Sequence, residues 1–193
     1  MEIILATTSP YRQEAFKSLN LDFKAEGSNV EEYFDGRPES PEELVRELSR
    51  LKAEAVRGKH NEGIIIGFES VGYFDGKVLE KPKSREEAYD RLKVLSGNNH
   101  QFYTGIFMIE LGSGKTLSRA VKTDVHMRKL EDKEINKYLD EDPNFQTYAL
   151  GYDPLGNYSS SFVKRIEGSY NNLIRGIPLE EIVEMLHEIG FSL

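Results

Sequence analysis

Cysteine is missing from the 193-residue sequence, and histidine occurs only four times. Without cysteine the chain has no disulfide bonds, no thiolate metal sites and no cysteine nucleophile. No two histidines have the spacing of a zinc site, which argues against a zinc hydrolase. The G-x-S-x-G pattern of a serine nucleophile elbow is also absent. The composition therefore disfavours several common classes of hydrolase.

Long hydrophobic runs are missing too, since no apolar stretch approaches the ~18 residues that a membrane-spanning helix needs. The N-terminal apolar run covers only residues 3–6, and Glu2 stands where a secretory signal carries basic residues. We therefore expect a cytoplasmic protein that spans no membrane. The chain is 38% hydrophobic and 30% charged, and its length suits one domain or two small lobes with a real core.

Positive charge is scarce, because the formal net charge is -8 and no block of five or more like charges occurs. A general binder of duplex DNA needs a basic face, so we expect no duplex nucleic acid as a partner. A small anionic substrate remains compatible with this charge, because a few local cations can dominate a binding site.

The most informative local pattern lies in the first nineteen residues. Ile3–Ala6 is an apolar run that predicts a buried strand, and Ser9 followed by Pro10 predicts a helix capped by Ser9. A strand that leads into a helix N-terminus leaves free backbone N–H groups, which bind phosphate. Arg12, one turn into this helix, adds a cation suited to bidentate phosphate contact. The alternative is an ordinary capped helix with a surface arginine, and these residues alone favour it.

Hydrophobic periodicity predicts strands and helices along the rest of the chain. The predicted strands cover residues 21–25, 64–73, 101–110, 116–127 and the region of 162–166, and the predicted helices cover 41–58, 84–95, 131–139 and 178–189. Residues 26–39 are polar and predict a loop, and residues 111–115 predict the turn of a hairpin. Because strands and helices are interspersed, we expect an α/β or mixed α+β fold.

Three polar residues outside the first loop are candidates for chemistry. Glu69 lies in the segment 67–70, which follows the buried run Ile64–Ile66, and ligands of α/β sheets gather at the carboxyl ends of strands. Lys81 precedes a proline, which forces its backbone to be extended and directs its ammonium group. Taken singly, each is better explained as a surface charge. His100 could act as a base, but a structural role is the favoured interpretation.

Six segments of the sequence follow one another in the order of a protein family. They read L-A-T-T-S-P-Y-R-Q-E-A-F at 5–16, the pair Glu31-Glu32 with Lys52 in the next helix, F-E-S-V-G at 68–72, D-G-K-V-L-E-K-P at 75–82, L-S-G with His100 and T-G at 95–105, and I-E-G-S-Y with G-I-P-L at 166–179. In this combination the chain resembles the Maf family of nucleoside triphosphate pyrophosphatases. The resemblance extends over nearly the whole chain.

The resemblance implies a fold and an activity. The fold is α/β, an elongated, mixed and twisted sheet flanked by helices, similar to inosine triphosphate pyrophosphatases. It forms a single domain over residues 1–193, with two lobes and a central cleft. The activity is hydrolysis of the α–β phosphate bond of nucleoside triphosphates or modified nucleotides, which yields a nucleoside monophosphate and pyrophosphate. The family works as cytoplasmic housecleaning enzymes with a divalent cation, Mg²⁺ or Mn²⁺, and often as homodimers.

The resemblance also implies roles for individual residues. The substrate phosphates are expected to contact Ser9, Arg12, Lys52 and Lys81, and the divalent cation is expected to bind Glu32 and Glu69. Such cations need carboxylate oxygens, and Mg²⁺ takes one or two of them together with water and phosphate. Glu69 is the expected base that orients or deprotonates the attacking water.

The chain departs from the family pattern around this site. Tyr11 replaces the first arginine of S-P-R-R, and Leu155 occupies the position of a glutamine. Glu69 and Ser70 replace an aspartate and a threonine. The extra methylene of Glu69 moves its carboxylate by ~1.5 Å, and misplacement on that scale costs on the order of a hundredfold in rate. Two alternatives therefore stay open: a weak or silent protein that binds nucleotides and regulates, and a scaffold without a ligand.

Overall fold

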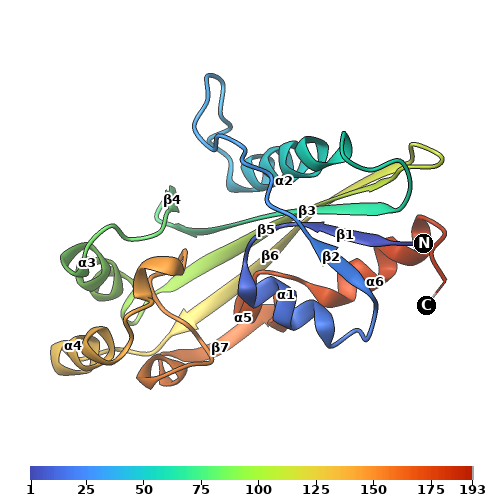
Figure 1. Ribbon diagram of the computed structural model, residues 1–193. Helices are drawn as coiled ribbons and strands as arrows, with labels where there is room; N and C mark the ends of the chain where they lie inside the picture. The colour runs from blue at the N-terminus through green and yellow to red at the C-terminus, as the bar shows by residue number, and fades with distance from the viewer. Residues whose placement is uncertain (193) are drawn as a thin grey trace. The chain divides into compact units, whose positions relative to one another are not determined.

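The computed structural model describes residues 1–192 (Figure 1). Its strands are β1 (Ile3–Ala6), β2 (Phe23–Ala25), β3 (Ile64–Phe74), β4 (Lys77–Leu79), β5 (Asn99–Glu110), β6 (Thr116–Met127) and β7 (Val163–Gly168). Its α-helices are α1 (Pro10–Lys17), α2 (Pro41–Arg57), α3 (Arg85–Leu95), α4 (Asp132–Glu141), α5 (Tyr170–Arg175) and α6 (Leu179–Glu188). Within the described residues, no helix is long and apolar enough to cross a membrane.

The strands form a single mixed sheet in the order β2-β1-β3-β5-β6-β7, and β4 pairs with β3. Strand β1 is parallel to both β2 and β3, whereas β3–β4 and β6–β7 are antiparallel. The predicted α/β class, with a mixed sheet flanked by helices, is confirmed. The central cleft and the single-domain organisation that the resemblance implies stay predictions.

The chain divides into two compact units. The first unit holds Met1–Ser70, Thr104–Val121 and the residues from Arg175 onward, and the second holds Val71–Tyr103 and Lys122–Ile174. Three of the four boundaries between the units fall inside β3, β5 and β6, and the fourth falls inside α5.

The core of the first unit follows the alternation of side chains along its strands. One face buries Ile3, Leu5, Ile64, Ile66, Phe68, Ile106 and Met108 against Phe16 of α1 and Ile182, Met185 and Leu186 of α6. The other face buries Ile4, Ala6, Ile65, Phe107 and Ile109 against Ala53 and Val56 of α2. Figure 1 shows α2 on the side of these strands opposite to α1 and α6.

Two glycines let α2 lie directly on the sheet. A Cβ at Gly67 would come within 2.1 Å of the carbonyl oxygen of Ser49, and one at Gly105 within 2.0 Å of that of Val45. Any side chain at either position would push α2 away. This close approach fixes the height of α2 above β3, and with it the position of the side chains that α2 extends over the middle of that strand.

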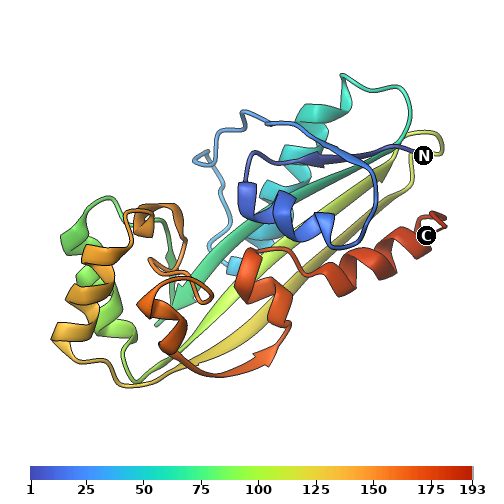
Figure 2. The ribbon, with the colours of Figure 1, turned by 60° about the horizontal axis from the view of Figure 1, so that its bottom comes forward.

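The core of the second unit is built around Phe162, which packs edge-on against Tyr138 and lies beside Tyr152. Helices α3 and α4 cover it side by side, as Figures 1 and 2 show. All three rings are almost completely buried. This unit therefore has a core of its own.

The sequence predicted most elements but not all of them. The starts of α1 and α2 at Pro10 and Pro41 are confirmed, although the Ser40 side chain makes no capping hydrogen bond. The predicted strand at 21–25 is shorter, because it begins at Phe23. Strand β4 and helix α5 were not predicted; they have three and six residues, too few to show a hydrophobic period.

Candidate functional site

The loop between β1 and α1 has the predicted capped geometry. The Ser9 hydroxyl accepts a hydrogen bond from the Arg12 backbone N–H at 3.4 Å, and Pro10 occupies the first turn. The Ser9 N–H donates to the Thr7 hydroxyl oxygen at 3.1 Å, which bends the chain sharply after β1. The loop therefore presents the N-terminus of α1 directly after a central strand of the first unit.

Arg12 is held by the protein and is not a surface arginine, so that alternative is wrong. Its Nε donates to the Gly176 carbonyl oxygen at 2.8 Å, and its Nη2 donates to Ser70 Oγ at 2.7 Å. The guanidinium carbon lies 5.6 Å from the centre of the Phe68 ring, within the range of a cation–π contact. Its Nη1 has no hydrogen-bond partner among residues 1–192.

Two carboxylates lie within electrostatic reach of Arg12. Burial lowers the pKa of the Arg12 guanidinium, while the negative charges of Glu69 and Glu32 act in the opposite direction. An arginine stays protonated despite such a shift, because its ordinary pKa is far above neutral. The first unit therefore brings a fixed cation and two acids into one neighbourhood.

The two acids meet at the ammonium group of Lys52 on α2. Lys52 Nζ donates to Glu32 Oε1 at 2.8 Å and also contacts Glu69 Oε2. The second oxygen of Glu69, Oε1, accepts the backbone N–H of Ser70 at 2.9 Å. The side chains of Lys52 and Glu69 are only 15% and 12% exposed, whereas that of Glu32 is 49% exposed. Glu69 is thus the shielded acid of the pair. Glu32 contacts the same ammonium group from the loop before α2.

The middle of β3 sends polar side chains to both faces of the sheet, so the expected position of Glu69 at the carboxyl end of a strand is wrong. Glu69 follows Gly67 on the face that α2 covers, and Ser70 follows Phe68 on the face of α1 and α6. Ser70 Oγ lies 2.8 Å from Thr104 Oγ1 on the neighbouring strand β5. These two consecutive residues therefore join the acid on one face to the arginine on the other.

Tyr11 stands where the family pattern has an arginine, and another arginine lies beside it. The Arg175 guanidinium carbon is 5.9 Å from the centre of the Tyr11 ring. Arg175 immediately precedes Gly176, whose carbonyl oxygen accepts from Arg12. A second cation is therefore present near the first turn of α1, although it comes from the end of α5.

The acids have the chemistry of a divalent-cation site. Glu32 and Glu69 place one oxygen each on the same ammonium nitrogen, so both oxygens converge on one position of positive charge. Mg²⁺ is commonly held by one or two carboxylates, with water and substrate phosphate as its other ligands. The part of the chain that the structure describes has no group of three or more histidine, cysteine or acidic side chains placed for a metal. Two carboxylates are as many as Mg²⁺ commonly takes from a protein, so the kind and number of these donors fit such a cation.

Two predicted positions lie in the second unit. Lys81 is exposed in the segment after β4, and Leu155 is 44% exposed. The role of Lys81 at the phosphates stays a prediction. Of the other predicted residues, Glu32 and Glu69 both contact Lys52. The backbone N–H of Arg12 donates to the Ser9 hydroxyl.

His100 lies in the buried core of the second unit. Its Nε2 is 3.2 Å from the Tyr152 hydroxyl, and burial lowers its pKa to about 4, with a smaller effect from His126. The imidazole is therefore neutral near neutral pH. Its burial and contacts agree with the structural interpretation.

Sequence reasoning gave no role to three residues of this network: Ser70 as an anchor, Thr104 and Gly176. Thr104 and Gly176 both fall in the quoted family segments T-G and G-I-P-L, so the sequence did carry a signal for them. Their contacts with Ser70 join parts of the chain that are 34 and 106 residues away. No local pattern predicts such contacts.

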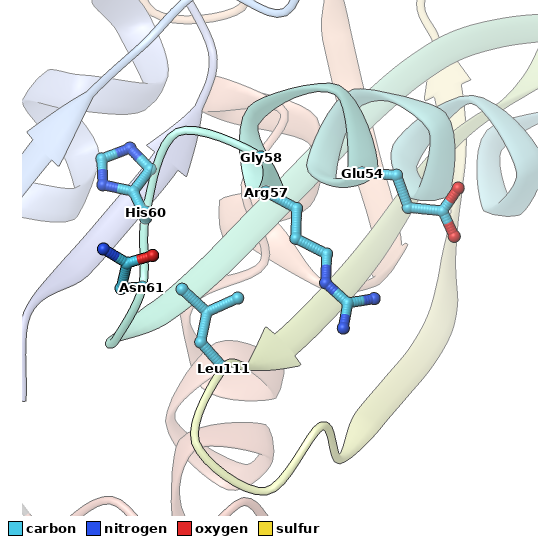
Figure 3. Close-up of a pocket in the computed structure, with 6 residues that line it drawn as sticks. All are labelled: Glu54, Arg57, Gly58, His60, Asn61 and Leu111. Carbon is cyan, nitrogen blue, oxygen red and sulfur yellow. The ribbon is translucent and has the colours of Figure 1, made fainter.

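A shallow cavity of about 450 Å³ lies at the C-terminal end of α2 (Figure 3). It is lined by Glu54, Arg57, Gly58, His60, Asn61 and Leu111. None of the predicted site residues takes part in it. The His60 ring is already engaged, since its Nε2 lies 2.6 Å from Glu26 Oε2.

The model of the family described as Maf-like protein matches residues 2–189. The chain belongs to the Maf family. A relative of this Maf-like protein from Carboxydothermus hydrogenoformans is 39% identical over 192 residues, covering 99% of this chain and 100% of the relative. One from Thermoanaerobacter sp. strain X514 is 38% identical over 192 residues, covering 96% and 95%. Both relatives carry the name dTTP/UTP pyrophosphatase.

The fold of this Maf-like protein is similar to that of a solved structure, the Ham1 protein of Staphylococcus aureus. The TM-score is 0.53 at 17% identity, with 98% of this chain and 100% of that chain covered. At such identity the likeness concerns the fold alone. This likeness supports the predicted α/β fold, a mixed sheet flanked by helices.

Proposed function

We propose that this Maf-like protein is a nucleoside triphosphate pyrophosphatase, which hydrolyses the bond between the α and β phosphates. The observation that carries the proposal is the contact of Glu32 and Glu69 with one ammonium group, beside an arginine that is fixed in place. The names of the relatives, dTTP/UTP pyrophosphatase, support the same reaction.

The cations of the first unit account for binding of the phosphates. Arg12 has two of its nitrogens on protein oxygens, so its orientation is set before substrate arrives and Nη1 remains available for a phosphate oxygen. The N-terminus of α1 adds backbone N–H groups and partial positive charge. Lys52 adds an ammonium group next to the acids, and Lys81 is a further cation in the proposal.

Glu69 acts on the water. Its Oε2 is the oxygen that faces Lys52, and it takes a proton from the water, or orients it, as the water oxygen bonds to phosphorus. The bond from phosphorus to the bridging oxygen breaks, and pyrophosphate and a nucleoside monophosphate leave. A base in this role contributes on the order of a hundredfold or more to the rate.

A divalent cation belongs to the proposal, because the carboxylate pair fits one. Glu32 and Glu69 would hold it, and it would neutralise charge on the phosphates. Mg²⁺ and Mn²⁺ are the cations we propose. For the substrate we propose dTTP and UTP, on the strength of the relatives' names.

A second candidate function is binding of nucleotides without turnover. The extra methylene of Glu69 favours it, because an acid longer than the aspartate of the family pattern places its carboxylate differently. A carboxylate drawn away from the water would leave the phosphate-binding cations intact and remove the base.

Product analysis separates these functions. The protein is incubated with dTTP or UTP and with Mg²⁺ or Mn²⁺, and the products are resolved by anion-exchange chromatography. The proposal predicts monophosphate and pyrophosphate in equal amounts. Diphosphate and inorganic phosphate would contradict it, and measurable affinity without any product would favour the second candidate.

A further inference from the structure

Ser70, in the middle of β3, makes two kinds of contact. Its hydroxyl oxygen accepts from Arg12 Nη2 at 2.7 Å and lies 2.8 Å from the Thr104 hydroxyl, which is fully buried. Its backbone N–H donates to Glu69 Oε1 at 2.9 Å. One residue is therefore bonded to the arginine on one face of the sheet and to the acid on the other.

The segment before α6 closes against the same hydroxyl. Gly176 has φ +62, and a Cβ there would lie 2.9 Å from Ser70 Oγ and 3.7 Å from Arg12 Nε. A side chain at this position would be strained and would displace the hydroxyl. The glycine carbonyl then accepts the Nε of Arg12, so three segments of the first unit meet at Ser70.

The two oxygens of Glu69 have different partners. Oε1 is occupied by the Ser70 N–H, and Oε2 is directed to Lys52. The direction of the carboxylate thus depends on where the backbone of residue 70 lies. That backbone is held within the sheet, and the Ser70 hydroxyl adds contacts with Arg12 and Thr104.

We propose that Ser70 is a positioning residue that holds Arg12 and Glu69 in fixed positions relative to each other on the two faces of the sheet. This inference rests on the proposed function, because it assigns Arg12 to the phosphates and Glu69 to the water. Loss of the hydroxyl leaves Arg12 Nη2 without its acceptor and removes the side-chain contact with Thr104 on β5. Both groups then shift together, and a displacement near 1 Å costs on the order of a hundredfold.

The sharpest test compares Ser70→Thr with Ser70→Val. The two new side chains have nearly the same shape and both suit a strand, so they differ in the presence of the hydroxyl. Steady-state kinetics with dTTP should show kcat/KM about tenfold or more lower for the valine variant than for the threonine variant. The loss should appear in KM through Arg12 and in kcat through Glu69.

A purely structural role would give a different result. It would lower the unfolding temperature of the valine variant while kcat and KM of the folded fraction stayed equal to those of the threonine variant. Equal kinetic constants for the pair overturn the inference. Ser70→Ala serves in place of the valine variant if that protein does not fold.

Failure of the proposed function can be told apart from failure of this inference. If the wild type hydrolyses no nucleotide, the proposed function fails, and crystal structures of the full-length threonine and valine variants decide the inference. We expect Arg12 to leave the Gly176 carbonyl and Glu69 to leave the amide of residue 70 in the valine variant only. Unchanged contacts in both variants overturn it.

Discussion

At the scale of single residues, the central feature is one ammonium group shared by two acids. Lys52 offsets part of the negative charge of Glu32 and Glu69 and so reduces the repulsion between them. The mostly shielded position of Lys52 and Glu69 strengthens this effect, because water screens the charges poorly there. The lysine therefore keeps the two carboxylates together as well as offering a cation to phosphate.

Replacement of Lys52 tests this arrangement. We expect Lys52→Met to lower kcat/KM with dTTP by about a hundredfold, because an electrostatic donor at the reacting groups is lost. Lys52→Arg keeps the charge and should lose less. Lys59→Met is the matched control, because Lys59 also pairs with a glutamate, Glu26, outside this group. A similar loss in the control and in Lys52→Met would contradict the assignment.

The sequence predicted several site residues but not the contacts that hold them. Family segments pointed to Arg12, Lys52 and Glu69, and the structure places all three in the first unit. The bond from Arg12 to Gly176 spans 164 residues, so no local pattern foretells it. The hydrogen bond from the Ser70 N–H to Glu69 is likewise visible only in the folded chain.

At the scale of elements, the placement of α2 depends on two glycines of the sheet. Helix starts were predictable because proline and acidic residues mark them locally, whereas the reason for Gly67 appears only when α2 lies on β3. The close contact sets the distance between Lys52 on the helix and Glu69 on the strand. Packing and chemistry are therefore coupled in this pair of elements.

Gly67→Ala should reveal this coupling. The added Cβ would meet the Ser49 carbonyl, so we expect a loss of about 1–3 kcal/mol in the free energy of unfolding. A drop in kcat should accompany it. Gly58→Ala is the control, because Gly58 at the end of α2 has φ -65 and open space around it. Urea unfolding measures both, and equal stability of the two variants would refute the packing argument.

Glu134, in the first turn of α4, should make the stability of the fold depend on pH. Glu134 accepts from Arg128 Nη2 at 2.8 Å, from the Glu131 N–H at 2.9 Å and from the Tyr158 hydroxyl at 2.8 Å. These contacts, above all the one with Arg128, lower the pKa of the Glu134 carboxyl from 4.5 to about 2. The ionised form therefore stabilises the fold above pH 4.5, and this contribution disappears as the pH falls toward 2.

Thermal unfolding of the wild type and Glu134→Gln checks this prediction. The variant should unfold at a lower temperature near neutral pH, and the difference should shrink as the pH falls through the window between the two pKa values. If the difference in unfolding temperature stays constant down to about pH 2, the charge of Glu134 does not contribute to stability.

At the scale of the whole molecule, the family match covers residues 2–189, and most of the predicted site lies in one of the two units. The relatives are aligned over nearly their whole length, and five of the predicted site residues fall in the first unit. The predicted class of fold was reachable from the sequence because the interspersed strands and helices show in its hydrophobic pattern. The division into two units was not, because its boundaries fall inside strands and a helix, where composition does not change.

The most direct test of the central claim is pyrophosphate release from dTTP and UTP by the wild type and by Glu69→Gln, with Mg²⁺ and Mn²⁺. The substitution keeps the size of the side chain and removes its charge. We predict release by the wild type and a loss of about a hundredfold or more in the variant, with the unfolding temperature retained. Equal release by the two proteins would contradict the role of Glu69, and no release by the wild type would contradict the proposed activity.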